Sequence, residues 1–237
     1  RAENEQRELG LRLRLMRTLM TTSGYSAAEH SHNLERALEL CENLRDSSSE
    51  IRILALQSVA AILGGDITTA ESILARARKV GEQFVDPVLL SHEPAVSGIT
   101  ALAKGQLNTA ERQFKYSIEL LSDADLRAPA GLFGHDPAAA SLGYSTISAW
   151  LLGYPDKARQ RGKLAIARAE SIGIPQVLTN ALDLALTAEH LCRDLEAAQL
   201  RADALDACME KYQHQPAVGG WLRSYSVALY HRQPVCY

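Results

Sequence analysis

Four segments of the chain share one pattern with a period of about forty residues. Each has a turn containing glycine or a polar pair, an alanine four or five residues later, and then a run of apolar residues at three- and four-residue spacing. The aligned alanines are 40, 48 and 40 residues apart, and they are Ala70, Ala110, Ala158 and Ala198. A degenerate earlier copy places Ala28 in the same role. Self-similarity at such a period indicates a repeat architecture.

Each unit is predicted to be a pair of antiparallel helices. Glycines at 64–65, 105 and 153 tolerate a left-handed C-cap and end the first helix. The small alanine that opens the second helix allows its partner to approach closely. Asp86-Pro87 and Asp136-Pro137 each place an N-cap acceptor before a proline at the first helical position.

The capping signals and periodicity place eleven helices along the chain. Pro94 lies inside the fifth, so that helix either begins late, at Ser91, or kinks. Residues 123–136 are expected to form one long irregular connection, either an inserted loop or a functional lid. The expected helices span 2–22, 26–45, 50–63, 67–83, 87–103, 107–122, 137–152, 155–172, 175–192, 195–213 and 216–231.

The hairpin pattern resembles tetratricopeptide (TPR) repeats, which carry alanine, three residues and then phenylalanine in the second helix. Ala110 and Phe114 match this spacing, and Gly98 falls where the signature has its first-helix glycine. Most signature tryptophans and tyrosines are absent. The expected fold is therefore all-α, a right-handed α-solenoid of about five to six TPR-like helical hairpins forming a single domain over 1–237.

A closer resemblance, carried by residues 24–44 and 134–173, is to the repeat region of large bacterial signalling proteins. The sequences GHDP at 134–137 and WLLGYPD at 150–156 are its most specific parts. In those proteins a class III adenylate/guanylate cyclase-like domain and an ATPase module precede the TPR repeats. The resemblance implies a C-terminal sensor or scaffold, with nucleotide chemistry in domains outside this chain. Residue 1 is not methionine, which fits an excerpt from a longer polypeptide.

Composition excludes several classes of partner. The net charge of −3 gives no electrostatic reason to expect nucleic acid. No uninterrupted apolar run approaches the roughly 20 residues of a membrane-spanning helix. The cysteines form no Cys-x-x-Cys pair and are interpreted as buried free thiols of a cytoplasmic protein; they are Cys41, Cys192, Cys208 and Cys236.

No catalytic, metal or cofactor motif is complete. Arg161-Gly162-Lys163 is followed by leucine and not by the serine or threonine of a phosphate-binding loop. His92-Glu93 lacks the second histidine of a zinc-peptidase helix, so His92, like His30 and His32, is expected at the surface. Asp136 is interpreted as an N-cap with His135 packed beside it. A basic cluster at 157–168 is interpreted as a solvated helix face. We expect no cofactor and no catalytic residue.

Stacked hairpins form a concave surface lined mainly by the first helix of each unit, where a protein or peptide partner is expected to bind. Apolar positions there would accept its side chains, although several positions are equally well explained as filler between tightly wound helices. The polar candidates for partner contact are Arg52, His92, Asn180, Asp183, Thr187 and His190.

The expected last helix, 216–231, is aromatic on a face that a terminal repeat normally keeps polar. Trp221, Tyr225 and Tyr230 predict that another subunit, further repeats or a crystal neighbour covers it, and self-association is one form of this.

Three functional hypotheses follow. The first is a cytoplasmic bacterial module that scaffolds or senses for an attached signalling enzyme. The second is a ligand- or peptide-sensing repeat domain of a transcriptional regulator. The third is an enzyme that uses 123–136 as a lid, and it requires a closed polar pocket beneath that segment.

Overall fold

The structure is a computed structural model that describes residues 2–122 and 124–212, except for 23–27. These residues form helices and turns and contain no β-strand. The helices are α1 (Ala2–Thr22), α2 (Ala28–Leu44), α3 (Ser47–Leu63), α4 (Ile67–Gly81), α5 (Pro87–Leu90), α6 (His92–Ala103), α7 (Leu107–Leu120), α8 (Ala128–Phe133), α9 (Pro137–Leu151), α10 (Pro155–Ile172), α11 (Pro175–Leu191) and α12 (Leu195–Tyr212).

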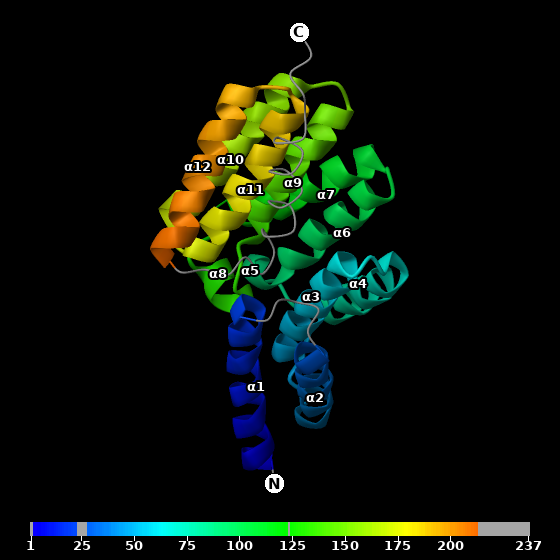
Figure 1. Cartoon of the computed structure of the whole chain (residues 1–237). Helices are drawn as coiled ribbons and strands as arrows, with labels where there is room; N and C mark the ends of the chain where they lie inside the picture. Colours follow the sequence, from blue (N-terminus) through cyan, green and yellow to red (C-terminus); the bar gives the residue numbers. More distant parts are fainter. Residues whose placement is uncertain (1, 23–27, 123, 213–237) are drawn as a thin grey trace.

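The long helices pack as successive hairpins that form an elongated stack (Figure 1). The hairpins are α1–α2, α3–α4, α6–α7, α9–α10 and α11–α12. First helices also contact one another, because α3 packs on α6, α6 on α9 and α9 on α11. We call these four helices the inner wall. The all-α solenoid predicted from the repeats is confirmed.

Four hairpins turn with the same backbone geometry. The residue before the second helix's N-cap is left-handed, with φ of 80° at Gly65, 71° at Gly105 and 86° at Gly153. In the last hairpin Arg193 takes this position with φ of 56°, although it carries a side chain. The amide after each of these residues donates a hydrogen bond to a carbonyl five residues earlier, as in Gln106 N to Ala101 O at 2.8 Å. This pairing ends the first helix and reverses the chain.

The four aligned alanines are buried, which fits the close helix approach predicted at these positions. Ala70, Ala110 and Ala158 are each 0% exposed, and Ala198 is 2% exposed. A larger side chain at these sites would separate the two helices of its hairpin, because protein interiors are packed without spare volume.

The fit is very close where α6 meets α7. A Cβ atom added to Gly98 would lie 2.5 Å from two ring carbons of Phe114. Phe114 is itself 1% exposed, so its ring has no free space into which to move. The signature-like pairing of Gly98 with the Ala110-to-Phe114 motif therefore has a direct steric basis.

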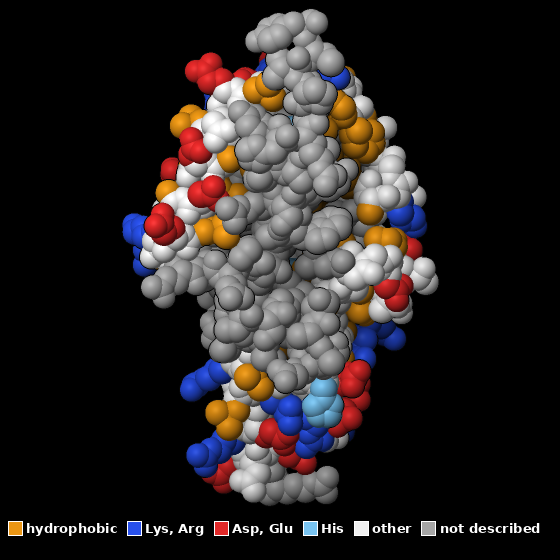
Figure 2. All heavy atoms as spheres, in the orientation of Figure 1, with side chains coloured by type: hydrophobic (Ala, Val, Ile, Leu, Met, Phe, Trp, Pro, Cys, Tyr) orange, Lys and Arg blue, Asp and Glu red, His pale blue; other side chains and the backbone are white. Residues whose placement is uncertain are grey.

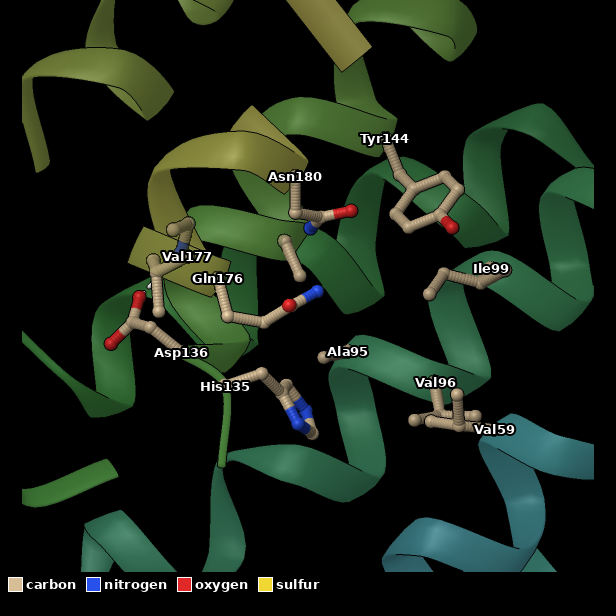
Figure 3. Close-up of a pocket in the computed structure, with 12 residues that line it drawn as sticks. Val59, Ala95, Val96, Ile99, His135, Asp136, Tyr144, Gln176, Val177 and Asn180 are labelled. Atoms are coloured by element: carbon tan, nitrogen blue, oxygen red, sulfur yellow. Dashed lines mark hydrogen bonds between the residues drawn. The ribbon is translucent and has the colours of Figure 1, made fainter. Parts of the chain in front are cut away.

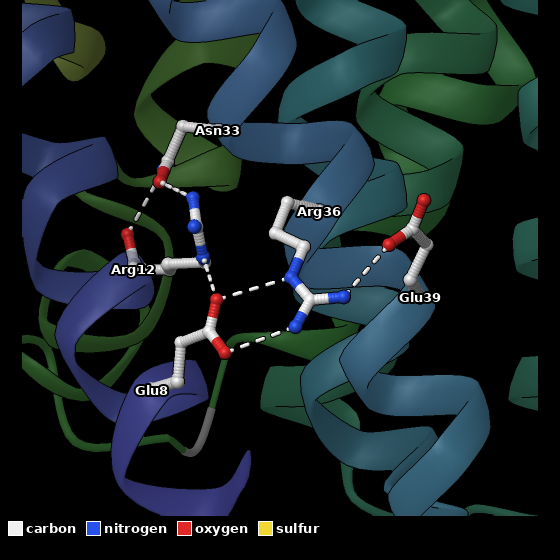
Figure 4. A network of polar contacts seen from close by, with 5 residues as sticks. All are labelled: Glu8, Arg12, Asn33, Arg36 and Glu39. Carbon is white, nitrogen blue, oxygen red and sulfur yellow. Dashed lines mark hydrogen bonds and ion pairs between the residues drawn. The ribbon is translucent and has the colours of Figure 1, made fainter.

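A polar network joins α1 to α2 (Figure 4). The Arg36 guanidinium donates to both Glu8 oxygens at 3.0 Å, and Arg12 Nε donates to Glu8 Oε1 at 2.9 Å. Two guanidinium groups on one carboxylate lower the pKa of Glu8 to about 2. Figure 2 shows positive and negative side chains mixed at this end of the stack.

Two predicted segments differ in detail. The expected helix 87–103 is split into α5 and α6 at Ser91, which agrees with the late start considered for Pro94. The connection expected to be irregular contains α8, whose Phe133 is 1% exposed. The expected helix 216–231 lies outside the described residues. No described helix has both the length and the hydropathy needed to cross a membrane.

Replacement of Gly98 tests the close contact between α6 and α7. We expect Gly98→Ala to lower the free energy of unfolding by about 1–3 kcal/mol, because the new methyl group overlaps the Phe114 ring. Gly10→Ala is the matched control: its added Cβ meets nothing within 4 Å, and alanine favours a helix over glycine by about 1 kcal/mol. Urea unfolding of both variants should show opposite signs, and stabilisation by Gly98→Ala would contradict the steric explanation.

Candidate functional site

A pocket opens on the inner wall where α6, α9 and α11 meet and α3 approaches (Figure 3). It contains about 670 Å³ of empty space including its open mouth. Most of its walls are aliphatic, and polar groups enter from α11 and from the residues before α9. It is lined by Val59, Ala95, Val96, Ile99, His135, Asp136, Ala139, Ala140, Tyr144, Gln176, Val177 and Asn180.

One face of α11 supplies a row of polar side chains beside this pocket. Gln176, Asn180, Asp183, Thr187 and His190 recur at four- and three-residue spacing, which places them on a single helix face. The amides of Gln176 and Asn180 point into the space between α11 and α6 (Figure 3) and form no hydrogen bond with the described residues. The Thr187 hydroxyl donates to the backbone carbonyl of Asp183 at 3.1 Å.

Asp183 is the most deeply buried member of this row. Its side chain is 0% exposed, and neither carboxylate oxygen has a hydrogen-bond partner among the described residues. Burial raises the pKa of Asp183 to about 7, because the charged form loses its hydration. Burial and the nearby Asp183 charge together raise the pKa of Tyr144 to about 12. The carboxyl therefore titrates near neutrality beside a neutral phenol.

Three aromatic rings cluster next to the pocket, and one of them, His135, lines it. The ring centroid of His92 lies 5.0 Å from that of Phe133 and 4.8 Å from that of His135. Burial lowers the pKa of His135 to about 4 and that of His92 well below its usual range, so both rings are neutral at pH 7. Within the described ranges, His92 Nε2 and His135 Nδ1 are buried without a hydrogen-bond partner. The expectation that His92 lies at the surface is wrong, since it is 2% exposed.

Asp136 fixes the chain beside this cluster. Its carboxylate accepts a hydrogen bond from Ala139 N at 2.6 Å, which confirms the predicted N-cap. The Arg168 guanidinium donates to both oxygens of the same carboxylate, at 2.7 and 3.0 Å. The interpretation of 157–168 as a solvated basic face is therefore wrong for Arg168, and also for Arg161, which forms a two-pronged ion pair with Glu111 at 2.7 Å.

The other predicted contact residues are distributed along the stack. Arg52 lies half-buried on α3, and His190 lies half-buried near the end of α11. Among the six polar candidates, Asn180 lines the pocket. Trp221, Tyr225 and Tyr230 lie outside the described residues. Sequence reasoning missed Gln176 and Tyr144, although Gln176 precedes Asn180 by about one helical turn on the same face of α11.

The pocket does not match the requirements of the enzyme hypothesis. Its walls are mainly aliphatic, whereas a lid-covered catalytic site needs a closed polar pocket beneath 123–136. Over the described ranges, no cluster of three or more histidine, cysteine, aspartate or glutamate side chains has the geometry to hold a metal ion. Cys41, Cys192 and Cys208 are free thiols, with Cys192 only half-buried.

The raised pKa of Asp183 predicts a pH-dependent stability. The folded chain holds this proton up to about pH 7, whereas the unfolded chain releases it near the ordinary value of 3.8. The contribution of Asp183 to the free energy of unfolding is therefore greatest below pH 4 and falls as pH rises to 7. We expect a loss of roughly 3 kcal/mol between pH 5 and pH 8 relative to Asp183→Asn, measured by urea unfolding. Parallel pH profiles of the two proteins would contradict this.

The pairing of Asp136 with Arg168 predicts a second stability change. We expect Arg168→Gln to lower the free energy of unfolding by about 3 kcal/mol, because it leaves a carboxylate of 0% side-chain exposure without its counter-ion. Lys163→Gln, at an exposed position of the same helix, should change it by less than about 0.5 kcal/mol. Equal effects in chemical denaturation would show that general charge loss on α10, and not the ion pair, is responsible.

Comparison with known proteins places this arrangement among repeat folds. No protein-family model and no curated protein matches the chain. The solved structures that resemble it include a candidate kinesin light chain from Podosopora anserina with nearly identical TPR-like repeats, at 12% identity and a TM-score of 0.51, covering 90% of this chain and 98% of that one. A single-substitution variant of that protein gives a TM-score of 0.53 at 12% identity, covering 90% and 97%. BtubC (BKLC) from P. vanneervenii gives 0.54 at 13% identity, covering 89% and 93%. At such identities the likeness concerns the fold alone, and the chain has a TPR-like repeat fold.

Proposed function

We propose that this chain is a non-catalytic interaction module of a cytoplasmic bacterial signalling protein, and that it binds an extended segment of a partner protein on its inner wall. The observation that carries the proposal is the pocket between α6, α9 and α11, with aliphatic walls and two unengaged amide side chains. TPR-like repeats serve protein–protein interaction in general, and the stacked first helices provide the concave surface for it.

The chemistry of the pocket suits a peptide. A primary amide both donates and accepts hydrogen bonds, as does the peptide backbone. Gln176 and Asn180 lie one helical turn apart and therefore offer paired contacts to an extended main chain. The wall formed by Ala95, Ile99 and Ala140 accepts an apolar side-chain stem. The neutral ring of His135 places no positive charge on the pocket wall.

The signalling setting has separate support. It is based on the resemblance of residues 24–44 and 134–173 to the repeat regions of cyclase- and ATPase-containing proteins. The second of these segments includes the GHDP sequence, which provides His135 and Asp136 to the pocket. In this proposal the enzymatic domains belong to other parts of the full-length protein, and this chain senses or scaffolds for them.

A selection from a random peptide display library tests the proposal. We expect the full chain to enrich peptides with a consensus sequence. The double variant Gln176→Ala/Asn180→Ala should bind the enriched peptide with an affinity lower by about tenfold or more, since two backbone-binding amides are lost. The matched control is Asn108→Ala/Gln199→Ala, which removes the same two amide types from exposed positions on α7 and α12. Fluorescence anisotropy measures the affinities. An equal loss of affinity in both double variants would show that the peptide does not bind at the pocket amides.

A further inference from the structure

The first and last hairpins of the described stack each have a neighbouring hairpin on one side only. In these hairpins α1 packs against α2, and α12 packs against α11. Figure 1 shows α1 at the lower end of the stack and α12 at the upper end. A terminal repeat normally keeps its outer face polar, because no further repeat covers it. Both α1 and α12 expose a pair of leucines instead.

α12 presents an acidic face with two leucines. Leu195 and Leu200 are 52% and 62% exposed. Helical periodicity places the exposed acidic residues of α12 on the same side as these leucines, with Lys211 at the edge. The acidic residues are Glu196, Asp203, Asp206 and Glu210. We call this side the α12 face, and Figure 2 shows acidic and apolar side chains together over α12.

α1 presents a basic face with two leucines. Leu11 and Leu15 are 59% and 46% exposed. Arg7 and Arg14 are exposed and lie about one turn before and after Leu11 on the same side, and Glu3 precedes them. Neither arginine belongs to the polar network that joins α1 to α2 (Figure 4). We call this side the α1 face.

We propose that the α1 face of one copy docks on the α12 face of a second copy, so that the chain associates head to tail. The two faces have opposite charges, and each contributes two leucines to the contact. Carboxylates of one copy then lie opposite arginines of the other, while the leucines of both copies are removed from water. This inference goes beyond the proposed function, because it uses the ends of the stack and leaves the inner wall free.

Charge also decides which faces meet. Two α1 faces would place arginines against arginines, and two α12 faces would place carboxylates against carboxylates. The head-to-tail contact avoids this repulsion. It also leaves one α1 face and one α12 face unused in every dimer, so the association continues into longer chains unless the rotation between copies closes a ring.

Sedimentation velocity of the full chain tests the contact. At low ionic strength we expect the mean mass to rise above that of one chain as the protein concentration increases. Because exposed charges are screened by salt, a change from about 0.05 M to about 0.5 M NaCl should weaken the association.

Two double variants test which faces take part. Leu11→Gln/Leu15→Gln alters the α1 face, and Leu195→Gln/Leu200→Gln alters the α12 face. Each variant alone should associate at least about tenfold more weakly than the wild type, because the buried leucines are lost. An equimolar mixture retains one intact α1 face and one intact α12 face per pair. It should therefore form heterodimers that do not grow further.

Charge exchange tests the complementarity. Arg14→Glu alone and Asp203→Lys alone should each weaken the association, whereas both substitutions in one chain should restore it. The matched control is Leu151→Gln/Leu164→Gln, since these leucines are 50% and 49% exposed on α9 and α10. This control should associate like the wild type. Urea unfolding checks that each variant is folded.

The outcomes do not depend on peptide binding at the inner wall. The inference is overturned if the wild type stays monomeric up to the highest concentration that remains in solution. It is also overturned if either leucine variant alone associates like the wild type, which would place the contact on another face, or if the mixture forms no heterodimer. The leucine variants keep the pocket residues, so their affinity for an enriched peptide tests the proposed function separately.

Discussion

The close approach of paired helices at small residues is the constraint on which the rest of the structure depends. In the four hairpins with aligned alanines, an alanine of 0–2% exposure opens the second helix. A left-handed residue just before that helix reverses the chain within a few residues. The first helices can then contact one another directly, and the inner wall with its pocket is the result.

Local signals in the sequence were sufficient for the hairpins, because turns, caps and aligned alanines act within one or two helical turns. The structure also resolves the alternatives at Pro94, since Ser91 separates α5 from α6. Contacts between distant segments were not predictable in this way. Arg168 reaches Asp136 across 32 residues of sequence, and Arg161 reaches Glu111 across 50. A helical pattern gives the face of a side chain, but it does not give the partner that the next hairpin presents.

The same distinction applies to the candidate site. The repeat pattern placed Asn180 and Asp183 among the concave positions, and Asn180 lines the pocket. The burial of His92 depends on Phe133 and His135, which lie in the segment expected to be irregular. No periodic pattern in the sequence therefore predicted it. Asp183 has no hydrogen-bond partner among the described residues, and a pattern in the sequence does not show whether neighbouring helices supply a donor. Such a buried carboxyl costs stability, because its ionised form loses hydration without gaining a partner among the described residues.

Segment 123–136 breaks the forty-residue repeat, and this irregularity has a consequence for recognition. A uniform solenoid offers several near-identical grooves, so an extended ligand can slip by one repeat and find similar contacts. Here the aromatic cluster that contains Phe133 and His135 occurs once along the described stack. Under the proposed function, a bound segment therefore has a single frame in which it meets this cluster. The interruption of the repeat thus gives an otherwise repetitive surface one distinct position that can set the register of a bound segment.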